Sequence, residues 1–339
     1  MEMKVLCLWY ATEAELSRLK AALPDETEVV APEGEYFSRF ESTFAELKRH
    51  AIDAEAMIGW AIPKGILEIA DKLKLLCWLH AGFDDLDFRL LKERRVTVAN
   101  TRGANAIAVA EQAIMFVLAL AKKTLFKHHA AQEGRRLFPV YADEYRSAML
   151  YGRTIAVVGA GNIGGHIAKC AKGFGMHVLG VRRNKDRPAA GVDVMYDIDE
   201  LRDVLAKSDY VVLSTPITPD TFQFFGKAEL DVMKPSAFLV NRAQGNLIQE
   251  KPLYEALTSG RLRGYAADVW WRYEFGRAFP IGYMPRLEIH KLPNVITSID
   301  QASNADDVLD RHLQWGIQSL VEFSNGGVPT RAIDLDLGY

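Results

Sequence analysis

The stretch Thr154–Gly175, TIAVVGAGNIGGHIAKCAKGFG, decides the fold. It opens with an apolar run typical of a buried strand and closes with a segment of helical spacing, and three glycines stand in the turn between them. Gly159 allows a tight turn, Gly161 lets a pyrophosphate approach the backbone, and Gly164 packs the helix against the strand. A dinucleotide-binding turn is therefore predicted here.

The first turn of the following helix, which contains Asn162 and Ile163, adds to this site. Its N–H groups have no partner within the helix, and they carry the positive end of the helix dipole. Phosphate groups are therefore expected to bind at this helix terminus.

The end of the next expected strand, His177–Val181, indicates which dinucleotide is bound. In NAD sites a carboxylate at this point accepts hydrogen bonds from the ribose 2′-OH. Here Arg182 and Arg183 follow the strand, and the next carboxylate is Asp186. Because two guanidinium groups suit a 2′-phosphate, the predicted cofactor is NADP, with NAD as the alternative.

Apolar runs and helical segments alternate along the rest of the chain, which predicts an α/β protein with parallel sheets covered on both faces. Thr12 and Glu15 form a capping box at the start of a helix over Thr12–Ala22, and Ala106–Lys123 and Asp306–Glu322 are further helices. The expected strands are Lys4–Tyr10, Glu28–Ala31, Ala56–Trp60, Leu75–His80, Val96–Asn100, Thr154–Val158, His177–Val181, Val194–Tyr196, Tyr210–Ser214, Ala237–Asn241, Gly264–Asp268 and Val295–Ser298.

The composition argues against several classes of protein. With 41 Lys and Arg against 44 Asp and Glu, the net charge of −3 gives no electrostatic case for nucleic acid or an anionic membrane as partner. An apolar stretch long enough for a transmembrane span is lacking. Cys7, Cys77 and Cys170 are far apart, so neither a disulfide framework nor a metal site is expected. A reducing, cytoplasmic compartment is the expected location.

Longer motifs resemble those of the D-isomer-specific 2-hydroxyacid dehydrogenases. LLCWLHAGFDDLDFRLLKERRVTVANTRGANAIAVAEQAIMFVLALAK is similar to that family's substrate loop, hinge and following helix, and STPITPDT is similar to its loop over the cofactor. FLVNRAQGNLIQEKPLYEAL resembles the stretch that carries the NxARG motif. GYAADVW and LPNVITSIDQAS resemble the DV and NVxxxPHxA segments, so the resemblance covers essentially the whole chain.

The resemblance implies an NAD(P)-dependent oxidoreductase that acts on the CH–OH group of a small molecule. Its fold would be two Rossmann-like or flavodoxin-like, doubly wound parallel-sheet domains with a cleft between them. Residues 1–104 and 300–339 would form a discontinuous substrate domain, and residues 105–299 the dinucleotide-binding domain. A homodimer built on the second domain is also implied, which suits the apolar helix Ala106–Lys123.

The resemblance also assigns binding roles. Beyond the glycine turn and the two arginines, the cofactor contacts that it implies are Thr215, Pro216, Asn241, Arg242 and Asp268. The backbone of Ala81 and Gly82 and the side chain of Asn105 match family contacts to the substrate carboxylate.

Two catalytic positions depart from the family pattern. Gln244 stands where the family has the arginine of NxARG, and Asp300 stands where it has the histidine that acts as general acid and base. The glutamate that tunes this histidine falls on Tyr273 by strict spacing, or on Glu274 with a shift of one residue. The catalytic candidates are therefore Gln244, Asp300 and Glu274.

These replacements make the expected site about two charges more negative. Each charge is worth up to roughly 4 kcal/mol against an anion at ~4 Å and an effective dielectric of ~20. An aspartic acid with a pKa near ~3.9 is also a poor acid at neutral pH unless burial raises that value. A plain 2-oxoacid should bind poorly unless Arg242, Arg102 or Arg272 compensates.

Three functions remain open from the sequence. The protein is an oxidoreductase for an unusual substrate, a catalytically inactive nucleotide-binding or sensing member of the family, or a cofactor-dependent enzyme of redox-neutral chemistry. Tyr10, Trp60, Trp78 and His80 lie at strand ends near the expected substrate loop, where core packing is favoured over a binding role.

Overall fold

The structure is a computed structural model that describes residues 3–34, 38–82, 86–271 and 286–335. The described chain divides into two compact units. Unit 1 comprises the described residues of 1–105 and 306–339, and unit 2 those of 106–273 and 281–305. Each unit is built on one parallel sheet, which confirms the predicted α/β class.

Unit 1 contains a five-stranded sheet in the order β2-β1-β3-β4-β5, with all strands parallel. Its strands are β1 (Lys4–Cys7), β2 (Glu28–Val30), β3 (Ala56–Gly59), β4 (Leu75–Trp78) and β5 (Thr97–Asn100). Its helices are α1 (Glu13–Ala22), α2 (Phe44–Ala51), α3 (Ile66–Ile69), α4 (Phe88–Glu93) and α11 (Val308–Ser324).

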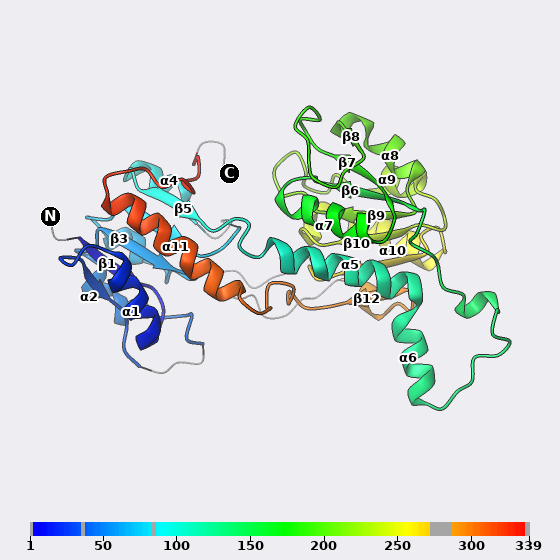
Figure 1. The fold of residues 1–339 in the computed structure, drawn as a ribbon, viewed down its shortest axis with the longest axis horizontal. Coiled ribbons are helices and arrows are strands. Elements are labelled where there is room, and N and C mark those ends of the chain that lie inside the picture. The colour runs from blue at the N-terminus through cyan, green and yellow to red at the C-terminus, as the bar shows by residue number, and fades with distance from the viewer. Residues whose placement is uncertain (1–2, 35–37, 83–85, 272–285, 336–339) are drawn as a thin grey trace. The chain divides into compact units, whose positions relative to one another are not determined.

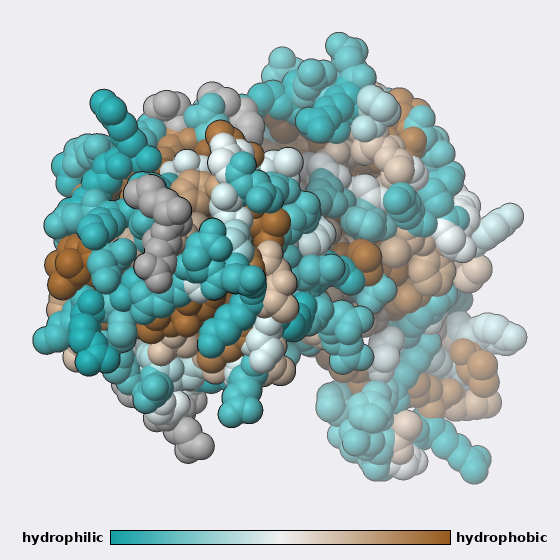
Figure 2. All heavy atoms as spheres, turned by 60° about the vertical axis from the view of Figure 1, so that its left-hand side comes forward, coloured by the Kyte–Doolittle hydropathy of each residue, from teal (hydrophilic) through white to brown (hydrophobic). Residues whose placement is uncertain are grey.

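Both faces of this sheet are buried. Side chains from α1 and α11, among them Leu19 and Leu313, pack on one face, and α2, α3 and α4 cover the other through residues such as Leu47. Figure 1 shows the C-terminal helix α11 beside α1 on the same face. The outer surface of unit 1 in Figure 2 is mainly hydrophilic, with apolar atoms in small patches.

The end of the chain also joins unit 1. After α11 it returns to β5, where Asn100 N–H donates to the Arg331 carbonyl at 3.2 Å and Ile333 N–H donates to the Val98 carbonyl at 2.8 Å. Ala99 and Ala332 form an antiparallel bridge. The first hundred residues and the C-terminal segment therefore share one core.

Unit 2 contains a seven-stranded parallel sheet in the order β12-β11-β10-β9-β6-β7-β8. Its strands are β6 (Thr154–Val158), β7 (His177–Val181), β8 (Val194–Tyr196), β9 (Tyr210–Leu213), β10 (Phe238–Asn241), β11 (Gly264–Ala267) and β12 (Val295–Thr297). The α-helices are α5 (Ala106–Lys122), α6 (Thr124–Gln132), α7 (Asn162–Gly173), α8 (Leu201–Lys207), α9 (Lys227–Val232) and α10 (Glu250–Thr258). The 3₁₀ turns are η1 (Asp143–Tyr145), η2 (Ile198–Glu200), η3 (Gly245–Leu247) and η4 (Ile289–Lys291).

The order of strands in unit 2 reverses at β6. The chain runs from β6 through β7 to β8 on one side, and then returns to β9 on the other side of β6. In open parallel sheets, ligands bind at such a reversal, outside the carboxyl ends of the strands. The helices α5 and α7 cover one face, and α8, α9 and α10 the other.

Each expected strand has a counterpart, but several are shorter than their apolar runs. Leu8, Trp9 and Tyr10 continue the run of β1 and are buried, yet the strand ends at Cys7. The apolar run is longer than the strand because buried positions favour apolar residues whether or not those residues belong to a strand. The predicted helix Ala106–Lys123 ends at Lys122, because Lys123 adopts a left-handed backbone with φ +53° before α6 begins.

Among the described residues, the structure contains no helix with the length and apolar character needed to cross a bilayer. The predicted capping box of α1 is confirmed, since Glu15 N–H donates to Thr12 Oγ1 at 3.2 Å and Thr12 N–H donates to the Glu15 carboxylate at 2.8 Å. Glu15 also accepts two hydrogen bonds from Arg39 and one from Trp9 Nε1. The Glu15 carboxylate therefore links α1 to Trp9, which follows β1, and to Arg39, which precedes α2.

We predict that Glu15→Ala lowers the free energy of unfolding by about 2 kcal/mol, because it removes a half-buried carboxylate with several charge-assisted hydrogen bonds. Glu13→Ala, in the same turn of the helix but exposed, should cost less than about 0.5 kcal/mol. Urea denaturation of both variants measures the difference. Equal losses would contradict the role of Glu15.

The pH dependence of this difference has a definite sign. Burial alone would raise the pKa of Glu15, but the hydrogen bonds from Arg39, Thr12 and Trp9 outweigh it and lower the pKa. A lowered pKa gives stability that is complete above the unfolded value, about 4.3, and is lost as the pH falls through the folded value. The gap between the wild type and Glu15→Ala should therefore be constant near neutral pH and shrink in acid.

Candidate functional site

The glycine turn between β6 and α7 has the geometry that a pyrophosphate site requires. Gly159 has φ +97°, and a Cβ there would lie 2.6 Å from the Ser214 carbonyl carbon. A Cβ on Gly164 would lie 2.3 Å from the Gly159 carbonyl oxygen, whereas a Cβ on Gly161 would meet nothing within 4 Å. Two glycines therefore allow close packing, and the third leaves the backbone open to a ligand, as predicted for a dinucleotide.

The helix that follows supports the same function. α7 begins at Asn162, and its N-cap, Gly161, has no side chain that could cap it. The N–H groups of its first residues, Asn162, Ile163 and Gly164, precede the first intrahelical bonds, so they are suited to bind a phosphate.

The end of β7 is basic. Arg182 N–H donates to the Tyr196 carbonyl, and its guanidinium donates to the Arg187 carbonyl at 3.1 Å, so its side chain lies along the 182–187 loop. Arg183 is exposed and forms a 3.2 Å ion pair with Asp220, which is also exposed. An exposed pair of this kind is worth little, so Arg183 can exchange it for a phosphate.

The other predicted residues of unit 2 lie at the same edge of the sheet, because each follows the carboxyl end of a parallel strand. Thr215 and Pro216 follow β9, and Thr215 Oγ1 donates to the Val158 carbonyl at the end of β6 at 3.0 Å. The β9 loop is thereby held beside the glycine turn. The sheet thus brings the glycine turn, the arginines and this loop to one edge.

Asn241, the last residue of β10, shapes the next loop. It is fully buried, its Nδ2 donates to the Gln244 carbonyl at 2.9 Å, and its Oδ1 accepts from Ala243 N–H at 3.1 Å. The side chain of Gln244 is half-buried and makes no hydrogen bond to another described residue. Asn241 therefore holds the turn, and the amide of Gln244 is available to a ligand.

Asp268 is the centre of the polar network at this edge. It is fully buried, and its carboxylate accepts from Gln301 N–H at 3.0 Å, from Ala302 N–H at 3.1 Å and from the Ser298 hydroxyl. Arg242 Nη1 lies 3.1 Å from Asp268 Oδ2. The carboxylate thus ties β10 and the loop after β12 to β11.

Arg242 is itself nearly buried, with 6% of its side chain exposed. Its Nε has no hydrogen-bond partner among the described residues. An unpaired buried donor is costly, and removing one partner of a buried ion pair is strongly destabilising. The ion pair with Asp268 therefore keeps the Arg242 guanidinium buried inside unit 2.

Asp300 is bonded to Asp268 through its backbone. Its N–H donates to the Asp268 carbonyl at 2.8 Å, and its backbone is left-handed, with φ +55°. The surrounding protein desolvates its carboxyl and raises its pKa above the ordinary value, while Arg242 opposes this shift and Asp268 adds to it. The residue keeps an exposed surface, so water moderates the shift.

Tyr273, Glu274 and Arg272 lie outside the described residues. Arg102, the other arginine considered as a compensating cation, is exposed in unit 1. Asn105 is the last residue of the N-terminal part of unit 1, and it is half-buried.

The loop 80–82 of unit 1 is held in place through its carbonyl groups. The carbonyls of His80, Ala81 and Gly82 accept hydrogen bonds from Thr101 N–H at 3.1 Å, Asn100 Nδ2 at 3.2 Å and Trp78 Nε1 at 2.8 Å. The N–H groups of Ala81 and Gly82 donate to no other described residue. Such an arrangement of backbone N–H groups suits an anion, as expected for a carboxylate.

The aromatic residues near this loop are packed in the core. Trp60 and Trp78 are buried, and Trp60 meets Trp9 edge-on at 5.1 Å. His80 Nε2 donates to the Trp60 carbonyl at 2.9 Å, and burial lowers the pKa of His80 to about 4. The favoured interpretation of Trp60 and Trp78 as core residues is therefore confirmed.

Sequence reasoning missed two residues of these networks. Ser298 joins Asp268 to Gln112 of α5, whose Nε2 lies 3.2 Å from Ser298 Oγ. His312 of α11 is buried, lies 2.5 Å from Thr101 Oγ1, and has its pKa lowered to about 4 by burial. The signal that could have identified His312 was its position on the apolar face of the predicted helix Asp306–Glu322.

Comparisons with known proteins agree with this arrangement. Residues 114–298 match the sequence model of the "D-isomer specific 2-hydroxyacid dehydrogenase, NAD binding domain". The chain is 29% identical over 291 residues to the glyoxylate reductase of Korarchaeum cryptofilum, and the match covers 84% of each chain.

Solved structures share the fold of the whole chain. A D-isomer specific 2-hydroxyacid dehydrogenase family protein from Aeromonas salmonicida subsp. salmonicida is 26% identical, with a TM-score of 0.82, and the match covers 99% of this chain and 100% of that one. An acyclic imino acid reductase, Bsp5, solved with NADPH and D-Arg, is 23% identical, with a TM-score of 0.78 and coverage of 98% and 100%. At that identity the second likeness concerns the fold alone.

We predict that Gly164→Ala weakens NADPH binding at least about 10-fold, because its Cβ must displace the backbone of the phosphate-binding turn. Gly173→Ala, in the same helix but with open space around its Cβ, should leave affinity unchanged and stabilise by at most about 1 kcal/mol. Isothermal titration calorimetry, with thermal unfolding in parallel, measures both. Wild-type affinity in Gly164→Ala would refute this account of the turn.

Proposed function

Since the chain belongs to the D-isomer-specific 2-hydroxyacid dehydrogenase family and is an NAD(P)-dependent oxidoreductase, we propose that it prefers NADP(H) and acts on an atypical substrate. The observation that carries the cofactor preference is the Arg182-Arg183 pair at the end of β7. Gln244 and Asp300, at the positions of the family's arginine and histidine, carry the substrate argument.

The residues present suit the 2′-phosphate of NADP. Arg182 and Arg183 supply two guanidinium groups where NAD sites have a carboxylate, and Arg183 is bound only to an exposed Asp220. The open backbone at Gly161 and the start of α7 would hold the pyrophosphate, and Thr215 supports this site from the adjacent loop. When bound, the nicotinamide supplies or removes a hydride.

The chain's own residues then determine the substrate. The amide of Gln244 can orient a polar group of the substrate, but it carries no charge. The carboxyl of Asp300 holds or accepts a proton, and the N–H groups of Ala81 and Gly82 offer an anion site in unit 1. Without a cation at position 244, we expect slow turnover of glyoxylate, pyruvate or hydroxypyruvate, because a developing alkoxide lacks its usual stabilisation.

We predict that NADPH binds at least about 10-fold more tightly than NADH, the value of one charge-assisted hydrogen bond to phosphate. Arg182→Asp should reverse this ratio, because it removes a cation and supplies a carboxylate for the 2′-OH. Isothermal titration with both reduced cofactors measures the ratio. Lys251→Asp makes the same change of charge on an exposed part of α10 and should leave it unchanged. Equal affinities in the wild type would rule out the preference.

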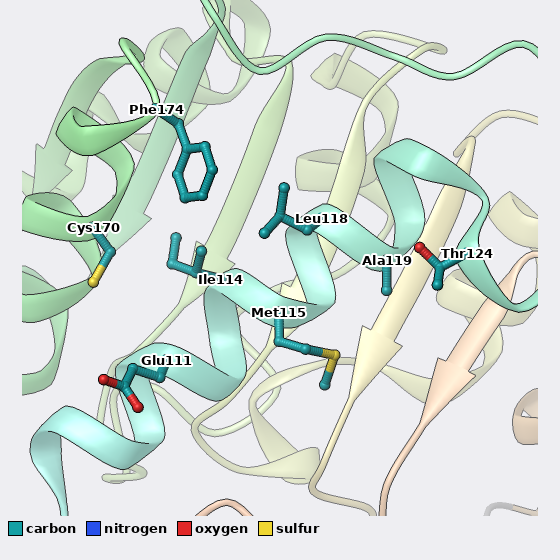
Figure 3. A pocket seen from close by; sticks show the side chains of 8 residues that line it. All are labelled: Glu111, Ile114, Met115, Leu118, Ala119, Thr124, Cys170 and Phe174. Carbon is teal, nitrogen blue, oxygen red and sulfur yellow. The ribbon is translucent and has the colours of Figure 1, made fainter.

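We also propose that the protein is a homodimer built on unit 2. An apolar groove on α5, α6 and α7 is lined by Glu111, Ile114, Met115, Leu118, Ala119, Thr124, Cys170 and Phe174 (Figure 3). Met115, Leu125 and Phe174 are each more than 40% exposed, and in the segment after α6 Phe138 and Tyr141 are more than 80% exposed. An apolar groove with exposed apolar side chains on the same unit is a candidate protein interface.

We predict that light scattering at micromolar concentration reports about twice the 37.9 kDa chain mass. Met115→Glu should shift the protein toward the monomer, because it places a charge in the apolar groove of both copies. Ile52→Glu, at an exposed apolar residue of unit 1, is the matched control and should stay dimeric. A stable wild-type monomer would exclude this assembly.

A further inference from the structure

Three charged residues of the described chain follow the carboxyl ends of β10, β11 and β12, and their pairing limits the substrate. They are Arg242, Asp268 and Asp300. Arg242 and Asp268 are 6% and 0% exposed at their side chains and lie 3.1 Å apart. Opposite charges at this distance largely cancel beyond the pair. Arg242 is therefore not a free replacement for the arginine that the family has at the position of Gln244.

Of these three residues, Asp300 is the one whose charge is not neutralised within the Arg242–Asp268 pair. Its N–H bonds to the Asp268 carbonyl at 2.8 Å from a left-handed backbone, and its carboxyl feels the charges of both Arg242 and Asp268. Gln244, the other residue at a catalytic position, is neutral. The three described residues Arg242, Asp268 and Asp300 thus carry a net charge of −1 when Asp300 is ionised and zero when Asp300 is protonated.

These charges would have opposite effects on hydride addition to a carbonyl and to an imine. Hydride addition to a ketone creates an alkoxide, and its negative charge would develop near Asp268 and Asp300, where Arg242 is already paired. An imine nitrogen is a far stronger base than a ketone oxygen, so a carboxylic acid can protonate it before hydride addition. The resulting iminium cation is stabilised by the Asp300 carboxylate beside it.

We infer that the reacting group of the substrate is a carbon–nitrogen double bond, and that Asp300 is the residue that protonates its nitrogen. This inference deepens the proposed function and rests on it, because it takes the protein as a nicotinamide-dependent reductase of an atypical substrate.

The step balances with the reduced cofactor as the two-electron donor. Asp300 gives its proton to the imine nitrogen, and a hydride from the reduced nicotinamide adds to the imine carbon. The C=N bond becomes a CH–NH bond, so the substrate is reduced to an amine while the cofactor is oxidised. Solvent returns a proton to the Asp300 carboxylate, on its exposed side.

The test uses pyruvate and NADPH with methylamine, which forms an imine with pyruvate in solution. Trimethylamine, which carries the same charge but cannot form an imine, is the control for ionic effects. We expect methylamine to raise the rate of NADPH oxidation by about 10²-fold over pyruvate alone, the scale of a general-acid contribution, with N-methylalanine as product by mass spectrometry. Trimethylamine should have no effect.

Variants separate the role of Asp300 from a structural one. Asp300→Asn keeps the shape, and asparagine tolerates the left-handed backbone, so it should fold and bind NADPH normally. It should lower the methylamine-dependent rate by about 10²-fold or more, and Asp300→Glu should restore part of it. Asp203→Asn, an exposed aspartate of α8, is the matched control and should keep the full rate. Gln244→Arg with Asp300→His should favour pyruvate without amine.

A binding measurement gives a second readout that does not depend on turnover. With oxidised cofactor present, N-methylalanine should bind more tightly than lactate, because its ammonium group faces the Asp300 carboxylate. Asp300→Asn should abolish this difference, as measured by isothermal titration calorimetry.

The outcomes distinguish the inference from the function on which it rests. Equal rates with and without methylamine, full activity of Asp300→Asn, or tighter binding of lactate would overturn the inference and leave an oxidoreductase of 2-oxo acids. Normal NADPH binding with neither mixture reduced would also overturn it. Failure to bind NADPH would instead count against the proposed cofactor preference.

Discussion

Parallel pairing of the strands is the constraint on which the rest of this structure depends. In a parallel sheet every strand points the same way, so the segments that follow the strands all emerge at one edge. In unit 2 this edge receives the glycine turn after β6, Arg182 after β7, Thr215 after β9, Arg242 after β10 and Asp268 after β11. Residues far apart in the sequence thereby become neighbours without any long loop.

A second, more local constraint is the buried carboxylate of Asp268. A buried charge must be satisfied by the protein, and here two backbone N–H groups, the Ser298 hydroxyl and Arg242 do so. The same contacts fix the loop that carries Asp300 and occupy Arg242. Asp268 thus both holds the loops after β10 and β12 together and neutralises Arg242.

Most of the fold was predictable because it follows from short-range patterns. Each expected strand has a counterpart, and the capping box at Thr12 and the turn at Gly159 were read from a few adjacent residues. The ends of elements were less accurate. Trp9 and Tyr10 are buried although β1 ends at Cys7, and the left-handed Lys123 ends α5 one residue before the predicted end, because both depend on what the rest of the unit packs against them.

By itself, the sequence determined the α/β class, the glycine turn after an apolar strand and the basic end of β7, since each is a matter of residue type and local spacing. Only the tertiary structure showed which residue pairs with the charged side chain of Arg242. The sequence left it as a candidate to compensate for the missing arginine, and the structure pairs it with Asp268. That pairing joins residues on neighbouring strands, and a contact across a sheet depends on strand order, register and burial, which local sequence patterns do not contain.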